Sequence, residues 1–262
     1  MEGFNETPSF YDTNEKFKKY LGQTSFYIAL QKCVSKLVKL AEPKEILELG
    51  FGTGETTVML AKENVKSKIT SVDIRQEMKE IAENNARNND LRNVDFFIKD
   101  MVKYVEEASM LPEFIVFLYS FHHVEDPSSN KVDFLKECFE RMPSNGRLCI
   151  AETFLPESTG KLHELSEIKS LWGKRINESY TSTFWSSLSG LEKENIDEAN
   201  LIAKYSLDNE ARAGELVWNR DNEYLISMGW LEDKAKAIGF EVEISEYCNS
   251  VGDGVVLLKK AK

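Results

Sequence analysis

The sequence predicts an α/β fold, in which a mostly parallel β-sheet is flanked by helices. Between residues 44 and 153, strand-like and helix-like patterns alternate, which is typical of parallel strands joined by helices. The run Phe114–Tyr119 is hydrophobic without interruption, as expected of a central strand buried on both faces. Two strand-like segments joined by a polar turn end the chain. The length of 262 residues allows one large domain, or one domain with a sizeable insertion.

The elements follow one another in a regular order. A helical stripe of apolar residues lies within residues 9–42, before the sheet. The predicted strands, in chain order, are Glu45–Leu49, Lys68–Val72, Val94–Ile98, Phe114–Tyr119, Arg147–Ala151, Phe240–Tyr247 and Val251–Lys259. The predicted helices of the repeating unit are Glu55–Glu63, Arg75–Asn89, Val132–Met142 and Tyr224–Ile238, the last with Gly239 as its C-cap.

One segment is too long to be an ordinary connection. Residues 156–223 separate the fifth strand from the last helix and contain their own helical patterns. We therefore predict three parts: an N-terminal helical cap at 1–43, a ligand-binding domain at 44–155 and 224–262, and a helical insertion at 156–223.

The composition limits the function. A net charge of −11 disfavours nucleic acid as a partner, because phosphate backbones are also negative. No run is long and apolar enough to cross a bilayer, and the acidic, polar Met1–Thr7 does not resemble a secretory signal. The four cysteines lack C-x-x-C spacing and are typical of buried thiols in a reducing compartment, so we expect a cytoplasmic protein.

The most informative stretch is Ile46–Glu55, a short strand followed by three alternating glycines and a helix start. Glycines permit positive φ and close backbone approach to a ligand, and the amides at a helix start favour negative or polarised oxygens. The pattern predicts a nucleotide-like cofactor at the carboxyl end of the first strand. A dinucleotide fingerprint would place its third small residue where Glu55 stands, which disfavours a dehydrogenase.

With Glu48 included, the turn has the form E-x-G-x-G-x-G, which resembles the first motif of the class I S-adenosylmethionine-dependent methyltransferases. The resemblance covers Lys44–Thr153 and the residues from 224 on. It implies a Rossmann-like, seven-stranded, mostly parallel sheet with a C-terminal antiparallel hairpin, and S-adenosylmethionine as cofactor with S-adenosylhomocysteine as product. One position departs from the family, whose fourth strand often has an acidic residue after an aromatic one, because Ile115 follows Phe114 here.

Two acidic residues end neighbouring strands. Asp73 lies about twenty residues after the glycines, where a carboxylate can accept hydrogen bonds from ribose hydroxyls, or can cap the helix that starts at Arg75. At Asp100 the resemblance implies an acceptor for the adenine amino group, with Met101 donating a backbone amide; the alternative is again a helix cap. We expect Glu48 to accept hydrogen bonds from backbone amides and shape the turn. The full predicted cofactor set is Glu48, Gly50, Gly52, Thr53, Gly54, Asp73, Ile74 (against the adenine), Asp100, Met101, Tyr119 and Ser120 (beside the sulfonium), with Tyr11 and Tyr20 closing over the cofactor.

The stretch Phe121–Asp126 resembles the F-H-H-V-x-D sequence of small-molecule methyltransferases of the ubiquinone/menaquinone type. Methyl transfer needs a general base only if the acceptor is a hydroxyl or an acidic carbon, so His122 and His123 are candidate bases. The alternative is that a histidine packs or hydrogen-bonds under the cofactor. Asp126 and Glu152 are acidic residues near strand ends, but no tight ligand spacing predicts a metal.

All four tryptophans follow residue 170, and the insertion follows the fifth strand, so it can cover the cofactor crevice. We predict a helical lid whose acceptor-binding residues include Trp172, Tyr180 and Trp185, with Arg175 pairing an acidic acceptor. Alternatively, these aromatics bury only the insertion's own core, or form a dimer interface, so the chain is expected to be a monomer or a homodimer.

The sequence therefore predicts methyl transfer from S-adenosylmethionine to a small-molecule acceptor through an O, N or C atom. One alternative is an RNA or protein methyltransferase, although no N-P-P-Y motif follows the fourth strand. Another is a cofactor-binding cyclase or regulatory protein that has kept the fold and lost methyl transfer.

Overall fold

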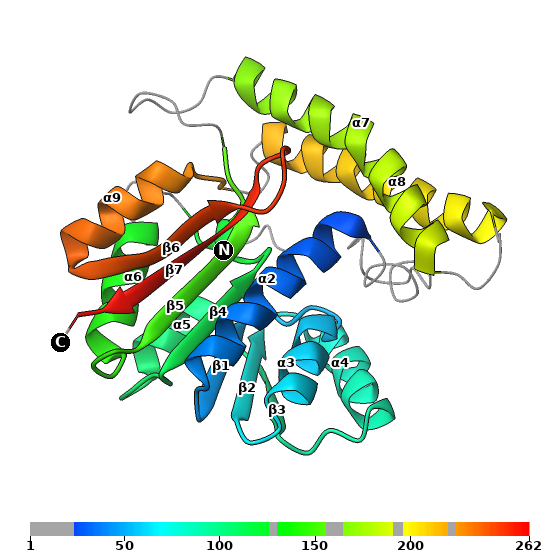
Figure 1. Ribbon diagram of the computed structural model, residues 1–262. Coiled ribbons are helices and arrows are strands. Elements are labelled where there is room, and N and C mark those ends of the chain that lie inside the picture. The colour runs from blue at the N-terminus through cyan, green and yellow to red at the C-terminus, as the bar shows by residue number, and fades with distance from the viewer. Residues whose placement is uncertain (1–23, 126–129, 156–164, 191–195, 220–223, 262) are drawn as a thin grey trace.

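One seven-stranded sheet organises the chain (Figure 1). The computed structural model describes residues 24–125, 130–155, 165–190, 196–219 and 224–261. The strands are β1 (Glu45–Leu49), β2 (Lys68–Asp73), β3 (Val94–Ile98), β4 (Phe114–Leu118), β5 (Arg147–Thr153), β6 (Phe240–Tyr247) and β7 (Asp253–Lys260). They are ordered β3-β2-β1-β4-β5-β7-β6, with β1 to β5 parallel and β7 antiparallel to both of its neighbours. The predicted fold class, including the C-terminal hairpin, is confirmed.

Helices cover both faces of the sheet (Figure 1). On one face lie α2 (Ser25–Ala41), α3 (Glu55–Glu63) and α4 (Gln76–Asn88), and on the other lie α5 (Met101–Glu107), α6 (Asn130–Arg141) and α9 (Met228–Ile238). The periodicity of α2 explains its place, because Leu30, Val34 and Val38 recur every fourth residue and pack against buried residues of the sheet. The alternating side chains of β4 reach two different cores, with Phe117 in one and Val116 in the other.

Several boundaries differ from the predicted ones for local reasons. Helix α9 starts at Met228, because the Ser227 side chain accepts a hydrogen bond from the Trp230 amide and caps it. Strand β5 runs on to Thr153, because its last residues pair with β7. The seven-residue helix α5 (Met101–Glu107) was anticipated only through the alternative helix-cap role of Asp100.

The insertion contains two long helices, α7 (Leu165–Gly190) and α8 (Ile196–Asn219), which lie side by side beyond the carboxyl ends of the parallel strands (Figure 1). Its two attachment points are neighbours. The Leu155 amide donates to the Ile226 carbonyl at 3.0 Å, and Leu155 forms an isolated parallel bridge with Ser227. Trp172 of α7 packs on Leu155, which holds the helix pair against the end of the sheet.

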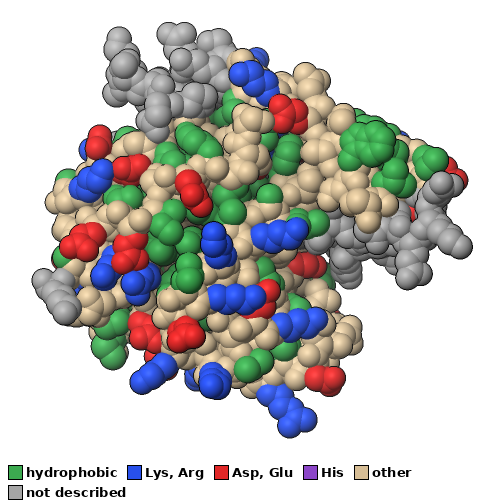
Figure 2. Space-filling view, in the orientation of Figure 1, with side chains coloured by type: hydrophobic (Ala, Val, Ile, Leu, Met, Phe, Trp, Pro, Cys, Tyr) green, Lys and Arg blue, Asp and Glu red, His purple; other side chains and the backbone are tan. Residues whose placement is uncertain are grey.

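The surface shows two local features (Figure 2). Lysines gather around α2, where Lys32, Lys36 and Lys39 line a groove of about 710 Å³ that contains none of the predicted site residues. Hydrophobic side chains are exposed on the helix pair, and Trp185 is 62% exposed. Within the described residues, no helix is both long and apolar enough to cross a membrane.

Candidate functional site

The glycine turn between β1 and α3 depends on positive backbone dihedrals. Gly50, Gly52 and Gly54 have φ values of 90°, 50° and 86°. A Cβ atom on Gly50 would lie 2.4 Å from the Ser120 Cβ, so the end of β4 packs directly on this bare backbone. A Cβ on Gly52 would meet no atom of the described residues within 4 Å. Gly50 is therefore needed for packing, whereas Gly52 faces open space that a ligand can occupy.

Asp73 holds the turn through the backbone. Its Oδ2 accepts from the Gly52 amide at 2.8 Å, and its Oδ1 accepts from the Arg75 amide at 2.9 Å. Burial raises the pKa of this carboxyl, and the two amides oppose that shift. The N-cap of α4 is Arg75, so Asp73 does not fill the capping position that was its alternative role. Each carboxylate oxygen has a second lone pair and can accept another hydrogen bond. Binding of ribose hydroxyls by Asp73 therefore stays a proposal.

The role expected of Glu48 requires a correction. Its Oε2 accepts hydrogen bonds from two hydroxyl groups, the Ser71 Oγ at 2.7 Å and the Thr57 Oγ1, and no backbone amide of the described residues donates to it. Glu48 is 2% exposed, and burial raises its pKa to about 7. The side chain thus joins β1, β2 and α3 beneath the turn.

The raised pKa of Glu48 predicts a pH-dependent stability. The unfolded carboxyl ionises near its ordinary value of 4.5 and the folded one near 7, so its contribution to stability is full below pH 4.5 and lost as the pH rises to about 7. The loss amounts to about 3 kcal/mol. The free energy of unfolding, measured by urea denaturation, should fall between pH 4.5 and 8 in wild type. We expect Glu48→Gln to remove the part of this fall that comes from Glu48. Asp73 and Glu55 also have raised pKa values, so the decisive quantity is the difference between variant and wild type; parallel curves would contradict the prediction.

The ends of β2 and β3 carry further residues predicted to contact the cofactor. Ile74 follows Asp73 and is 54% exposed, as expected of a residue that could lie against a ligand. The register pairs Asp73 with Ile98, which brings Asp100 to the same edge of the sheet. The Asp100 Oδ1 accepts from the Lys103 amide at 3.0 Å and caps α5, as its alternative role anticipated, and Met101 is the first residue of that helix. The buried Thr53 carbonyl accepts from the Asn85 side chain at 2.8 Å and fixes the turn against α4.

Next to the turn, β4 and β5 bring His122 and Glu152 together. The His122 Nδ1 lies 3.0 and 3.1 Å from the two carboxylate oxygens of Glu152. The His122 amide also donates to Oε1 at 3.3 Å. A carboxylate can only accept, so Nδ1 carries the proton and Nε2 is the acceptor nitrogen of the ring. The side chains of His122 and Glu152 are 12% and 4% exposed, so solvent barely weakens the pair.

The two histidines differ in their surroundings. His123 is exposed, and its ring centre lies 4.1 Å from that of His122. The His122 Nδ1 lies against the buried carboxylate of Glu152. His122 therefore has the geometry of an oriented base.

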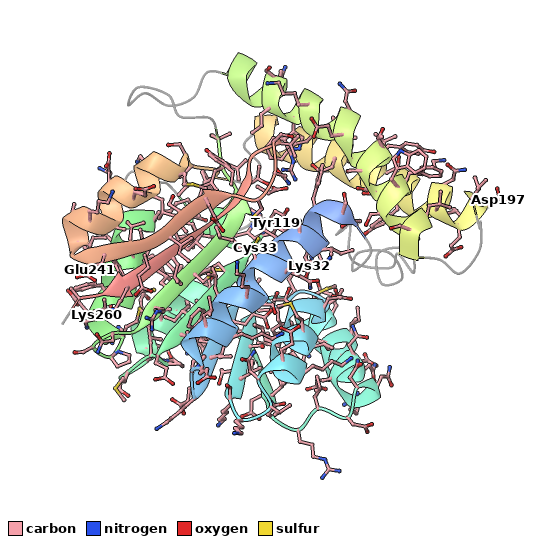
Figure 3. All side chains as sticks on the ribbon, in the orientation of Figure 1. Lys32, Cys33, Tyr119, Asp197, Glu241 and Lys260 are labelled. Atoms are coloured by element: carbon pink, nitrogen blue, oxygen red, sulfur yellow. The ribbon has the colours of Figure 1, made fainter. Side chains whose placement is uncertain are left out.

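Tyr119 and Ser120, which were predicted to lie beside the sulfonium, make their described contacts within the protein. Tyr119, which is labelled in Figure 3, has φ of 51°. Its ring stacks on Tyr27 of α2 with centres 6.2 Å apart. Its hydroxyl is buried and has no hydrogen-bond partner among the described residues. Ser120 is 3% exposed and donates to the Leu49 carbonyl at 2.5 Å. The Ser120 side chain thus joins the end of β4 to the end of β1, where the glycine turn begins.

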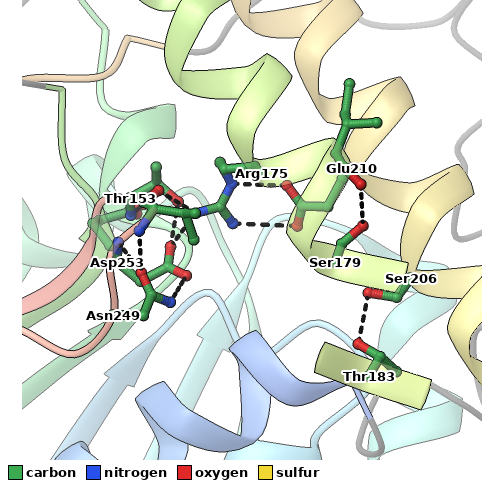
Figure 4. Close-up of polar contacts among 11 residues, drawn as sticks. Thr153, Arg175, Ser179, Thr183, Ser206, Glu210, Asn249 and Asp253 are labelled. Atoms are coloured by element: carbon green, nitrogen blue, oxygen red, sulfur yellow. Dashed lines mark hydrogen bonds and ion pairs between the residues drawn. The ribbon is translucent and has the colours of Figure 1, made fainter. Parts of the chain in front are cut away.

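Arg175 is engaged inside the protein (Figure 4). Its Nε lies 2.8 Å from the Glu210 Oε2, and its Nη1 lies 2.6 Å from the Asp253 Oδ1. All three side chains are at least nine-tenths buried. The guanidinium neutralises two carboxylates of this chain, so the structure gives it a structural role in place of the expected pairing with an acidic acceptor, and we withdraw that assignment.

The predicted acceptor residues do not share one place. Trp172 is buried in a small core with Leu155, so it packs between the insertion and the end of the sheet and not within the insertion alone. The Tyr180 hydroxyl donates to Asn200 of α8 at 2.5 Å, and Trp185 is largely exposed. Along a helix, thirteen residues span about 20 Å, so Trp172 and Trp185 cannot line one small pocket. Tyr11 and Tyr20 lie outside the described residues.

Sequence reasoning missed the pairing of Glu152 with His122. The signal was present, because adjacent parallel strands end at the same edge and both residues follow or end such strands. Within the described ranges, no group of three or more His, Cys, Asp or Glu side chains could hold a metal ion.

Comparisons with known proteins agree with this geometry. Residues 46–146 match the model of a family described as a methyltransferase domain. No curated protein matches the sequence. Among solved structures, an O-methyltransferase family protein from Burkholderia thailandensis superposes with a TM-score of 0.59 at 11% identity, covering 92% of this chain and 57% of that one. The N-methyltransferase NodS from Bradyrhizobium japonicum WM9, in complex with S-adenosyl-L-homocysteine, gives 0.59 at 10% identity, covering 96% and 95%. A SAM-dependent methyltransferase from Aquifex aeolicus gives 0.54 at 15% identity, covering 95% and 100%. The chain thus spans less than two thirds of the Burkholderia protein and nearly the whole of the other two.

Proposed function

We propose that the chain is a class I S-adenosylmethionine-dependent methyltransferase, which transfers the methyl group of S-adenosylmethionine to a hydroxyl group of a small-molecule acceptor. The match of residues 46–146 to a methyltransferase domain and the similar folds of solved methyltransferases support this proposal. The observation that carries the choice of a hydroxyl is the His122–Glu152 pair beside the glycine turn. An oriented imidazole is useful where the acceptor must lose a proton, whereas an amine that arrives neutral needs no base.

The cofactor side fits S-adenosylmethionine. Gly52 leaves open the space that a side chain would fill, the Asp73 carboxylate keeps lone pairs for ribose hydroxyls, and Ile74 exposes an apolar surface for the adenine. Asp100 and Met101 complete this side at the end of β3. When bound, S-adenosylmethionine supplies an electrophilic methyl carbon and leaves as S-adenosylhomocysteine.

The protein's own part is to orient the acceptor and take its proton. His122 Nε2 accepts the hydroxyl proton as the oxygen attacks, and the Glu152 carboxylate stabilises the imidazolium that results. In this proposal the α7–α8 pair, which lies beyond the carboxyl ends of the parallel strands, covers the acceptor and excludes water; this is the lid role predicted for the insertion.

The test has two parts. Calorimetric titration with S-adenosylmethionine, S-adenosylhomocysteine and NAD checks the cofactor, and we expect only the two S-adenosyl ligands to bind. Labelled methyl transfer is then screened on small phenols, their matched anilines, RNA and protein extracts. We expect the phenols to be methylated.

Variants of the two histidines identify the base. His122→Gln should lower kcat by about 10²–10⁴-fold while leaving S-adenosylmethionine affinity unchanged. His123→Gln is the matched control and should retain most of the activity. Equal activity of the His122 variant, or methylation of anilines, RNA or protein in preference to phenols, would contradict the proposal.

A further inference from the structure

A buried lysine lies behind the histidine turn and has no part in the chemistry above. Lys131 is in the first turn of α6 and is fully buried. Its ammonium lies 4.9 Å from the ring centre of Phe121 and 6.0 Å from that of Tyr224. A lysine is almost never buried completely unless its charge is satisfied, so this position requires an explanation.

The ammonium is satisfied by the backbone of the turn that carries His122. Lys131 Nζ donates to the carbonyl of Phe121 at 2.9 Å and to that of Val124, and it lies 3.4 Å from the carbonyl of His122. An ammonium has three donors, and the turn presents three carbonyls to it. The short 3₁₀ helix Phe121–His123 is thus held from its carbonyl side by one charge.

Electrostatics link this lysine to the base pair. Burial lowers the pKa of Lys131 to about 7, and the Glu152 carboxylate acts against that shift. Glu152 on β5 contacts the ring of His122, and Lys131 contacts the backbone of the same residue, so His122 lies between an anion and a cation. Losing the cation would release the turn and remove a positive charge whose field reaches Glu152.

We propose that Lys131 is a positioning residue, whose ammonium fixes the turn at residues 121–124 and so keeps His122 Nδ1 on Glu152. The importance of this for turnover rests on the proposed function, but the positioning itself does not. It can therefore be tested without an acceptor.

The test is nitrogen NMR of the histidine rings in the full chain without added ligand. The sequence has three histidines, and His122→Gln and His123→Gln variants assign the signals. In wild type we expect the neutral His122 ring to be protonated mainly at Nδ1. In Lys131→Met the ratio of the Nδ1-protonated to the Nε2-protonated form should fall about fivefold, as for the loss of one hydrogen bond. Lys136→Met on the same helix is the matched control, because Lys136 is exposed and pairs only with Asp133 among the contacts described, and it should leave the ratio unchanged.

A second measurement needs no variant and decides the question if Lys131→Met does not fold. In wild type, the His122 ring signals should show a step at the pH where the Lys131 side-chain carbon titrates. A folded Lys131→Met with an unchanged His122 ratio, or a wild-type His122 signal that ignores the lysine titration, would overturn the proposal. Calorimetric binding of S-adenosylmethionine is measured on the same samples, and its failure would refute the proposed function while leaving the positioning result intact.

Discussion

Replacing Gly50 by alanine should destabilise the fold by about 3 kcal/mol, and alanine at Gly52 should instead weaken S-adenosylmethionine binding in a protein that still folds. Both glycines have positive φ, which costs an alanine about 1–2 kcal/mol at either position. Only at Gly50 would the new methyl collide with Ser120, at 2.4 Å from its Cβ, and such overpacking adds about 1–3 kcal/mol. The Gly52 methyl would project into the space assigned to the cofactor.

The two variants form a matched pair, so one experiment separates packing from binding. Urea unfolding gives the free energy of unfolding, and calorimetry gives the affinity for S-adenosylmethionine. We expect at least a tenfold loss of affinity for Gly52→Ala, which corresponds to about 1.4 kcal/mol. Equal destabilisation by both variants would refute the contact with Ser120, and undiminished binding by Gly52→Ala would refute the position assigned to the ligand.

Replacing Arg175 by methionine should lower the free energy of unfolding by about 3–5 kcal/mol, because it would leave two buried carboxylates without their counter-charge. Glu210 belongs to α8 and Asp253 begins β7, so Arg175 fastens the helix pair to the sheet. We therefore also expect limited proteolysis to cut the region of residues 156–223 sooner in the variant than in wild type.

Arg147→Met is the matched control. Arg147 contacts both carboxylate oxygens of Glu243, at 2.7 and 3.2 Å, but the two side chains are 28% and 26% exposed. Its loss should cost about 1 kcal/mol or less. Similar costs for the two arginines would show that the buried network contributes little to stability.

Local patterns in the sequence were enough to predict the sheet and the cofactor turn. Alternating strands and helices, an uninterrupted central strand and three glycines each depend on residues close together in the chain, so their physical cause can be read locally. The acidic ends of β2 and β3 were predicted in the same way, because parallel strands end at one edge. Their hydrogen bonds to Gly52 and Lys103 agree with that placement, and their contacts with a cofactor stay predictions.

Contacts between distant residues could not be predicted. Arg175 is 35 positions from Glu210 and 78 from Asp253, and nothing in the local pattern distinguishes it from a surface arginine. The same is true of Glu48, whose hydroxyl partner on Ser71 comes from another strand. A lysine on a helix is ordinarily expected to face solvent. Lys131 is buried because α6 packs against the histidine turn, which the local sequence does not reveal.

Leu155 contacts Ile226 and Ser227, so the chain leaves and re-enters the sheet domain at neighbouring positions on either side of α7 and α8. A segment that leaves and re-enters a fold at neighbouring positions can be replaced by one of another length without moving the strands around it. Under the proposed function, exchanging this helix pair would change the part of the chain proposed to cover the acceptor and would leave the glycine turn unchanged. One constraint limits such chimaeras: Arg175 and Glu210 would travel with the helix pair and Asp253 would remain behind, so any transplanted helix pair must bring its own cation for that aspartate.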